Sequence, residues 1–479
     1  MTLRQKTING LKWSFVDSFA NQGFQFIIGI ILARLLVPKD FGLIGMLIFF
    51  IAISQSFIDS GFSQALIRKK DCKQVDFNTA FFFNLLVGIA FYLILFFSAS
   101  LIAGFFGEPQ LFSLIRVLGL VLLINAFGLI QRTILIKEIN FKLQTKISLI
   151  ASFISGIVGI GMALNGFGVW SLVYKTITQQ LATTFLFWLW NKWKPTAAFS
   201  VKAFKDLFQF GSKLLASGLI DTTYQNVYYL IIGKYFSATD LGYYTRADKF
   251  RKIPSQNLYG IIGRVSYPVL SSIQDESAKL KSAYKKFIQT TMYITFVLMI
   301  GLAATAEKVI LVLIGEQWLP AVPYLQLLCF VGMLYPLHAL NLNMLMVKGR
   351  SDLFLRLEVI KKTLAVPTII IGILFGIKIM IVGMIVNSVI AYYLNSYWSG
   401  KLIGYTVREQ ISDIYSSFTL AVLMGILTYL TGKVIEGGHL VVLISQIITG
   451  GLIILVFSEL IKLKPYIEIK SIVLGSIKR

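Results

Sequence analysis

Apolar segments of about 20 residues or more recur along the whole chain, and each is long enough as a helix to cross a hydrocarbon core of roughly 30 Å. This recurrence constrains the fold more than any other feature. The composition agrees with it, because 56% of the 479 residues are hydrophobic and only 14% are charged, whereas soluble proteins carry roughly 25% charged residues. The sequence therefore predicts an all-α polytopic membrane protein.

Fourteen transmembrane helices are expected, centred at about residues 23, 54, 90, 121, 155, 179, 219, 256, 296, 333, 366, 391, 425 and 450. The placement of Lys and Arg tests this count, since these residues accumulate in the cytoplasmic connectors of inner-membrane proteins. Alternate connectors are rich in them, and one holds Lys348, Arg350, Arg356, Lys361 and Lys362. The opposite connectors hold only Arg34, Lys39, Lys234, Lys308, Lys378 and Lys433. We therefore expect a multi-pass inner-membrane protein with both termini in the cytoplasm.

The net charge of +23 follows from this topology, because basic residues at the cytoplasmic surface contact anionic lipid. The sequence has no soluble basic domain, so a nucleic-acid partner is not expected. Cys72 and Cys329 build neither a disulfide framework nor a CxxC metal site, and the two histidines, His338 and His439, argue against a catalytic histidine. No cofactor, metal or catalytic residue is expected, and we do not expect an enzyme.

An internal repeat is visible at an offset of about 200 residues. The segment RLLVPKDFG at 34–42 aligns with KYFSATDLG at 234–242, so that Asp40 and Gly42 correspond to Asp240 and Gly242. One repeat holds six spans, an even number, which predicts two parallel six-helix lobes over 1–200 and 201–405. Residues 406–479 add two transmembrane helices and a cytoplasmic tail. Such lobes are typical of a transporter with alternating access, although chance similarity among apolar segments is the alternative explanation.

Charged residues inside the expected spans are the candidate site residues. The basic ones are Arg116, Lys175, Arg246, Lys249, Arg251, Lys252 and Arg264, and the acidic ones are Asp17, Asp59, Asp221 and Asp248. A charge at the centre of a transmembrane helix costs roughly 2.5–3.5 kcal/mol, so these side chains are expected to face a water-filled cavity or one another. The excess of basic residues indicates a cavity that prefers anions.

The eighth span carries a polar stripe. At 100° per residue its members fall within about 80° of one another; they are Arg246, Lys249, Asn257, Gly260, Arg264 and Tyr267. Pro254 is expected to kink this helix. Arginine binds phosphate through two parallel hydrogen bonds and lysine through a point charge, which indicates a phosphate-bearing ligand. Alternatively, residues 246–252 form an interfacial turn whose side chains reach the headgroups.

The other charges have two interpretations each. Arg116 and Lys175 are either substrate-binding residues or structural ion-pair partners. Asp17 and Asp221 either pair with eighth-span cations, bind a coupling proton or sodium ion, or hold helices together. Asp248 is a further ion-pair candidate at the same depth, and Asp59 is either a coupling residue or a solvated helix end.

Five segments resemble the signatures of bacterial polysaccharide exporters of the O-antigen, colanic-acid and teichuronic-acid type. They are Arg34–Gly42, Phe57–Leu66, Leu241–Phe250, Ile253–Asn257 and Val265–Asp275. The resemblance covers nearly the whole chain and implies the fold of the multidrug/oligosaccharidyl-lipid/polysaccharide exporter superfamily. It also implies a flippase that moves an undecaprenyl-pyrophosphate-linked oligosaccharide across the inner membrane for lipopolysaccharide or polysaccharide biosynthesis. The implied partners are the lipid-linked oligosaccharide, membrane lipids, a possible coupling ion and polysaccharide assembly proteins.

The resemblance transfers an anion-binding role to Arg246, Lys249 and Arg264, while Lys252 and Asn257 are further substrate-binding candidates. The equivalent stripe of the second span carries Met46, Phe49, Ser54 and Gln55 instead of cations. The expected site is therefore asymmetric, and the first lobe binds either phosphate or sugar hydroxyls.

Two rival functions remain. A cation or multidrug extruder of the same fold would need an acidic, aromatic cavity, and the excess of basic residues argues against it. A membrane-embedded glycan-modifying enzyme would need acids or a histidine gathered in a sizeable external loop. The external connectors are short, and their acidic residues are scattered among different loops.

Overall fold

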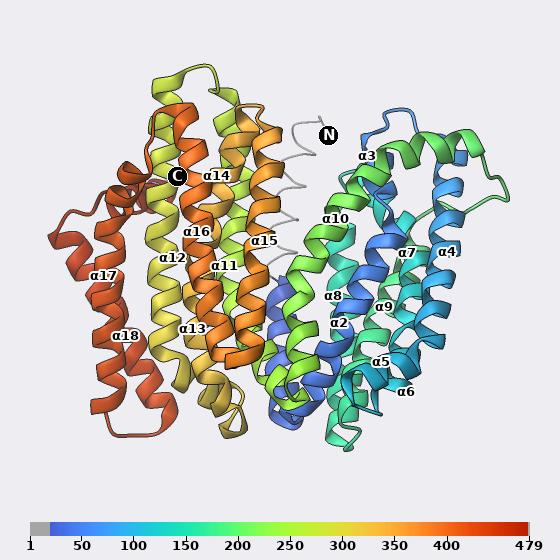
Figure 1. Cartoon of the computed structure of the whole chain (residues 1–479), viewed down its shortest axis with the longest axis horizontal. Helices are drawn as coiled ribbons and strands as arrows, with labels where there is room; N and C mark the ends of the chain where they lie inside the picture. Colours follow the sequence, from blue (N-terminus) through green and yellow to red (C-terminus); the bar gives the residue numbers. More distant parts are fainter. Residues whose placement is uncertain (1–19, 478–479) are drawn as a thin grey trace. The chain divides into compact units, whose positions relative to one another are not determined.

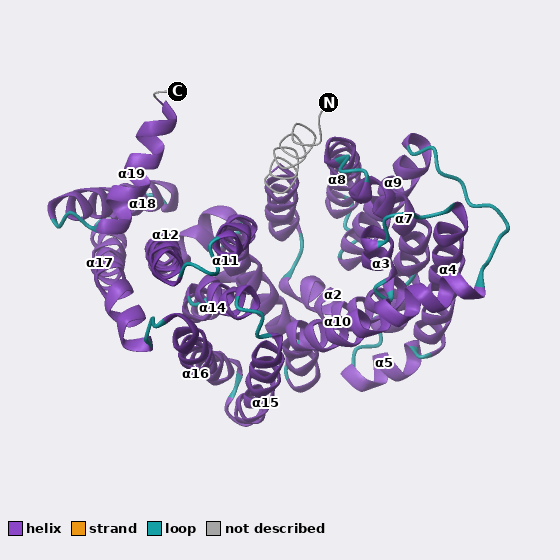
Figure 2. Cartoon of the chain, turned by 90° about the horizontal axis from the view of Figure 1, so that it is seen from above, coloured by secondary structure: helices purple, strands orange, loops and turns teal. Residues whose placement is uncertain are grey.

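Every regular element in the described part of the chain is a helix (Figures 1 and 2). The computed structural model describes residues 20–477, except for the side chains of residues 256, 257, 259, 261–265 and 472–477. Contacts divide the chain into two compact units, Met1–Gly242 and Tyr243–Arg479. The all-helical fold class predicted from the sequence is confirmed for the described residues.

The first unit begins with a helix over residues 20–35. The helices that follow are α2 (Pro38–Asp59), α3 (Phe62–Arg68), α4 (Gln74–Phe97), α5 (Ala99–Phe106), α6 (Leu111–Leu118), α7 (Leu120–Lys137), α8 (Phe141–Leu164), α9 (Val169–Trp190) and α10 (Val201–Tyr235). The first turn of α11 (Ala238–Ser272) also belongs to this unit.

The second unit contains the rest of α11. The elements that follow are α12 (Ser277–Leu313), the 3₁₀ helix η1 (Glu316–Ala321), α13 (Val322–Met333), α14 (Tyr335–Val347), α15 (Ser351–Phe375), α16 (Ile377–Ile403), α17 (Val407–Val434), α18 (His439–Leu460) and α19 (Lys464–Ile477). The last of these shows that the segment expected as a tail forms a further helix.

Nine segments within the described residues are long and apolar enough to cross a membrane. Large apolar side chains on such helices are exposed, for example Leu86 at 64% and Val434 at 77%, as lipid contact requires. Four further helices, α9, α10, α11 and α15, have 22 to 35 residues but are more polar. The chain is a multi-pass membrane protein, and the total of fourteen spans stays a prediction.

The two segments of the internal repeat begin their helices in the same way. The backbone N–H of Val37 donates to Asp40 Oδ2 at 3.3 Å at the start of α2. The backbone N–H of Ser237 donates to Asp240 Oδ2, also at 3.3 Å, at the start of α11. Each aspartate therefore satisfies an N–H that has no partner within its own helix.

The repeated glycines mark the place where these two helix starts cross. A Cβ on Gly42 would overlap the Ala238 carbonyl oxygen, and a Cβ on Gly242 would overlap the Pro38 carbonyl oxygen. Residues 38 and 238 are related by the same offset as the glycines, so one contact repeats the other with the roles exchanged. Such reciprocity is a property of two-fold interfaces, and glycine permits the close backbone approach. The two aligned segments therefore meet as equivalents at this crossing, and the repeat of two six-helix lobes stays a prediction.

Helix α10 packs along α2 within the first unit. Gly61, with a φ of +70°, lies in the turn between α2 and α3, and a Cβ there would lie 2.6 Å from the Gly211 carbonyl oxygen of α10. Phe62 adds ring contacts with Phe204 and Phe208 of α10, at centroid distances of 6.0 and 6.5 Å. The sequence repeat assigns α10 to the second lobe, and a lobe boundary at residue 200 stays a prediction.

Candidate functional site

In the second unit, the buried carboxylate of Asp248 on α11 holds two cations on its own helix. It forms ion pairs with Arg251 and, at 2.7 Å, with Lys252. The spacings of three and four residues place all three side chains on neighbouring positions of the helix surface. The Arg251 side chain also packs on α13, because a Cβ on Gly332 would lie 2.9 Å from Arg251 Cδ. Arg251 and Lys252 therefore share one counter-ion within the protein.

The other two cations of this segment, Arg246 and Lys249, are one turn apart on α11, so their side chains are neighbours on one face. Arg246 is half-buried, whereas Lys249 is exposed. Lys249 forms no ion pair or hydrogen bond with any residue that the structure describes. Asn257 and Arg264 also lie on α11, but their side chains are among those not described.

Arg116 on α6 lies between two aromatic rings. Its guanidinium carbon is 4.2 Å from the ring centre of Phe96 and 3.9 Å from that of Phe112. Its Nε donates to the Phe96 carbonyl oxygen at 3.2 Å. Such cation–π contacts stabilise the packing of α4 against α6, and substrate binding by Arg116 stays a prediction.

Lys175 on α9 begins a chain of hydrogen bonds across three helices. Its Nζ donates to Gln25 Oε1 at 2.9 Å, Gln25 Nε2 donates to Ser152 Oγ at 3.0 Å, and Ser152 Oγ donates to Asn21 Oδ1 at 2.7 Å. Asn21 and Gln25 lie on the first helix, and Ser152 lies on α8. This network ties the three helices together, and a substrate contact by Lys175 stays a prediction.

The remaining aspartates lie in the first unit. Asp17 falls outside the described residues. Asp59, near the end of α2, accepts a hydrogen bond from the backbone N–H of Ser63 at 3.2 Å. Asp221 is an exposed residue of α10. A coupling role for any of these three stays a prediction.

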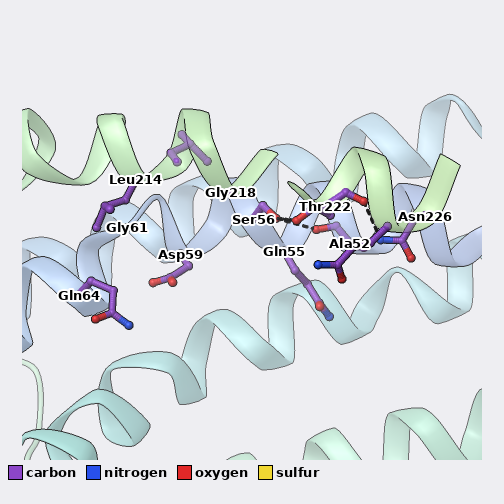
Figure 3. A pocket seen from close by; sticks show the side chains of 12 residues that line it. Ala52, Gln55, Ser56, Asp59, Gly61, Gln64, Leu214, Gly218, Thr222 and Asn226 are labelled. Carbon is purple, nitrogen blue, oxygen red and sulfur yellow. Dashed lines mark hydrogen bonds between the residues drawn. The ribbon is translucent and has the colours of Figure 1, made fainter. Parts of the chain in front are cut away.

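A groove of about 530 Å³ runs along the α2–α10 contact in the first unit (Figure 3). Its main polar side chains are Gln55, Ser56 and Asp59 of α2 and Thr222, Gln225 and Asn226 of α10. The hydroxyls of Ser56 and Thr222 are 3.0 Å apart and join the two helices, as the dashed line in Figure 3 shows. No Lys, Arg or aromatic residue is among the described residues that line it.

Comparison with known proteins identifies the family. The family described as "Polysaccharide biosynthesis protein" matches residues 31–323, which is more than half of the chain. The chain belongs to this family. A relative over nearly the full length is the lipopolysaccharide biosynthesis protein WzxC of Escherichia coli (strain K12), 27% identical over 451 residues that cover 91% of this chain and 90% of WzxC. The resemblance drawn from the sequence motifs is confirmed.

Two solved structures share the fold of this chain. The lipid II flippase MurJ in an inward closed conformation has a TM-score of 0.76 at 17% identity, covering 98% of this chain and 100% of MurJ. An inward-facing multidrug resistance transporter of the MATE family, in the MOP superfamily, has a TM-score of 0.63 at 15% identity, covering 80% of this chain and 94% of its own. At these identities the likeness concerns the fold alone.

One basic cluster that was expected in a cytoplasmic connector is helical. Lys361 and Lys362 lie about three turns inside α15, and their position on the cytoplasmic side stays a prediction. Both form ion pairs with Glu358, the one from Lys362 at 3.6 Å. Their side chains are only 13% and 17% exposed. The ion-pair spacings of three and four residues from Glu358 were the signal that a helix continues through this segment.

Proposed function

We propose that this protein flips an undecaprenyl-pyrophosphate-linked oligosaccharide from the cytoplasmic to the outer leaflet of the inner membrane. Exposed Lys249 beside half-buried Arg246 is the observation that carries the proposal. Asp248 pairs with the neighbouring cations, whereas Lys249 has no counter-ion among the described residues. A pyrophosphate supplies the negative charge that such a position favours. Asn257 and Arg264, further along the same predicted stripe, are proposed to extend this site.

Alternating access of two parallel lobes is the mechanism that we propose. The reciprocal crossing of Gly42 with Ala238 and of Gly242 with Pro38 supports it, because two-fold-related repeats can open in turn to either side. Both termini are proposed to lie in the cytoplasm. Asp59 and Asp221 are the candidates for a coupling proton or sodium site. In this account the protein performs no chemistry on its substrate.

Flipping in proteoliposomes tests the proposal. The probe is a fluorescent undecaprenyl-pyrophosphate oligosaccharide, and its flipping is compared between wild type and the Arg246→Gln/Lys249→Gln variant at equal incorporation. The matched control is Lys70→Gln, since Lys70 is exposed and lies in the connector after α3. We expect flipping by wild type and by the control, and a loss of at least about tenfold in the double variant, which a lost charge-assisted contact of 1.5–3 kcal/mol would cause. Equal rates in all three proteins would contradict the site.

Export of organic cations is the second candidate function. It is favoured by the carboxylate of Asp59 in the α2–α10 groove and by the exposed Asp221 on α10. Proteoliposomes loaded with ethidium distinguish the two functions. Ethidium transport that Asp59→Asn abolishes, together with no flipping of the lipid-linked probe, would select the cation exporter.

A further inference from the structure

The described lining of the α2–α10 groove of the first unit lacks the positively charged side chains that α11 carries. Its polar lining consists of carboxamides, hydroxyls and the carboxylate of Asp59, without a basic side chain among the described lining residues. A phosphate brought here would meet a like charge and no cation among the described lining residues, so it would gain no electrostatic attraction. The groove is therefore unsuited to the anionic part of a lipid-linked substrate.

The same lining suits sugar hydroxyls. A hydroxyl both donates and accepts hydrogen bonds, and a carboxamide offers two donors and an acceptor that can match it. Gln55 and Gln225 form no hydrogen bond with any described residue, so both carboxamides are available to a ligand. Figure 3 shows Gln55 and Asp59 following one another along α2, with Thr222 and Asn226 on α10 beside them.

The walls of the groove are fixed before any ligand arrives. At one end, the contact of Gly61 with Gly211 sets the separation of α2 and α10. The Ser56–Thr222 hydrogen bond joins the helices further along. Gly218, a lining residue between these two points, has no heavy atom within 4 Å of its Cβ position, which leaves open space. The volume of about 530 Å³ falls within the range of ~300–1,000 Å³ that small-molecule sites occupy.

We propose that this groove is the subsite for uncharged sugar residues of the lipid-linked oligosaccharide, with Gln55 and Gln225 as the residues that bind their hydroxyls. The inference rests on the proposed flippase function and assigns the sugar, rather than the phosphate, to the first unit. Such a site is selective, because a ligand without hydroxyls would leave the polar groups of the groove without hydrogen-bond partners and would bind more weakly.

Equilibrium binding of two lipids to the purified full-length protein tests the subsite. One lipid is undecaprenyl pyrophosphate, and the other is the undecaprenyl-pyrophosphate oligosaccharide extracted from the cells that produce the protein. We expect the Gln55→Ala/Gln225→Ala variant to lose about tenfold in affinity for the sugar-bearing lipid, as two lost hydrogen bonds would cause, and to keep its affinity for undecaprenyl pyrophosphate. Gln209→Ala is the matched control, because Gln209 is an exposed carboxamide on α10 outside the groove.

Each other outcome overturns the inference. If the double variant loses affinity equally for both lipids, or for neither, the groove does not bind the sugar. If wild type binds both lipids equally well, the sugar is not recognised, although the proposed flippase function stands. If wild type binds neither lipid, the flippase function fails as well. Because Gln225 is exposed, the single variant Gln225→Ala is expected to fold. Its affinities for the two lipids are measured instead if the double variant does not fold.

Discussion

Gly42 approaches the carbonyl group of Ala238 so closely that the backbone leaves no space for a side chain. The same relationship recurs between Gly242 and Pro38, which are the repeat counterparts of the first pair. Neither overlap can be relieved by rotating a side chain, because the opposing atoms belong to the backbone. The D-x-G pattern shared by the two repeats therefore has a physical cause: the aspartate caps a helix and the glycine lets two helix starts cross.

We expect Gly42→Ala and Gly242→Ala each to destabilise the protein by about 1–3 kcal/mol or more, as overpacking does. The two effects should be similar, because the contacts are reciprocal. Thermal unfolding of the full-length protein in detergent measures both. Gly104→Ala is the control, since a Cβ there has nothing within 4 Å. Melting temperatures equal to that of the control would show that the crossing is not as close as described.

Replacement of Asp248 by asparagine leaves Arg251 and Lys252 without their carboxylate. Breaking a buried ion pair in this way costs about 3–5 kcal/mol, and we expect a loss toward the lower end because the Lys252 side chain is 30% exposed. Thermal unfolding measures the loss, and Glu436→Gln, at an exposed acid, controls for the change in net charge. A variant as stable as the control would mean that the two cations find other partners.

Arg116→Gln separates a structural role from substrate binding. The arginine contacts Phe96 and Phe112 through their rings, so its loss should lower stability by about 1–2 kcal/mol. Flipping per folded molecule should stay within about twofold of wild type, because these contacts lie within the protein. Normal stability combined with abolished flipping would instead assign Arg116 to the substrate.

The fold was predictable because membrane insertion leaves strong linear signals. Apolar length predicted the helical class, which is confirmed for the described residues. The aspartate and glycine at equal places in two segments predicted a repeat, and these two segments cross reciprocally. Charge placement says less about where helices end, since Lys361 and Lys362 resemble a connector in sequence although they lie inside α15. Helices α10 and α11, which contain the spans expected at about residues 219 and 256, are too polar to be among the nine segments that are apolar enough to cross a membrane within the described residues.

The candidate site was only partly predictable. The α11 cations are visible in sequence because a charge within an apolar segment is conspicuous. The ion pairs of Asp248 with Arg251 and Lys252 follow from helical spacing. The α2–α10 groove was not found as a site, because its glutamines and hydroxyls come from two helices far apart in sequence. Such groups have no spacing pattern that distinguishes a ligand site from contacts between helices.

Changing the charge at Lys249 and measuring the flipping rate is the most direct test of the flippase account. Flipping of the lipid-linked probe is measured in proteoliposomes for wild type and for Lys249→Arg, Lys249→Gln and Lys249→Glu at equal incorporation. We predict rates that follow the charge: near wild type for arginine, lower by about tenfold for glutamine, and lowest for glutamate, because the substrate is an anion. Equal rates across the series, in proteins of equal stability, would contradict the account.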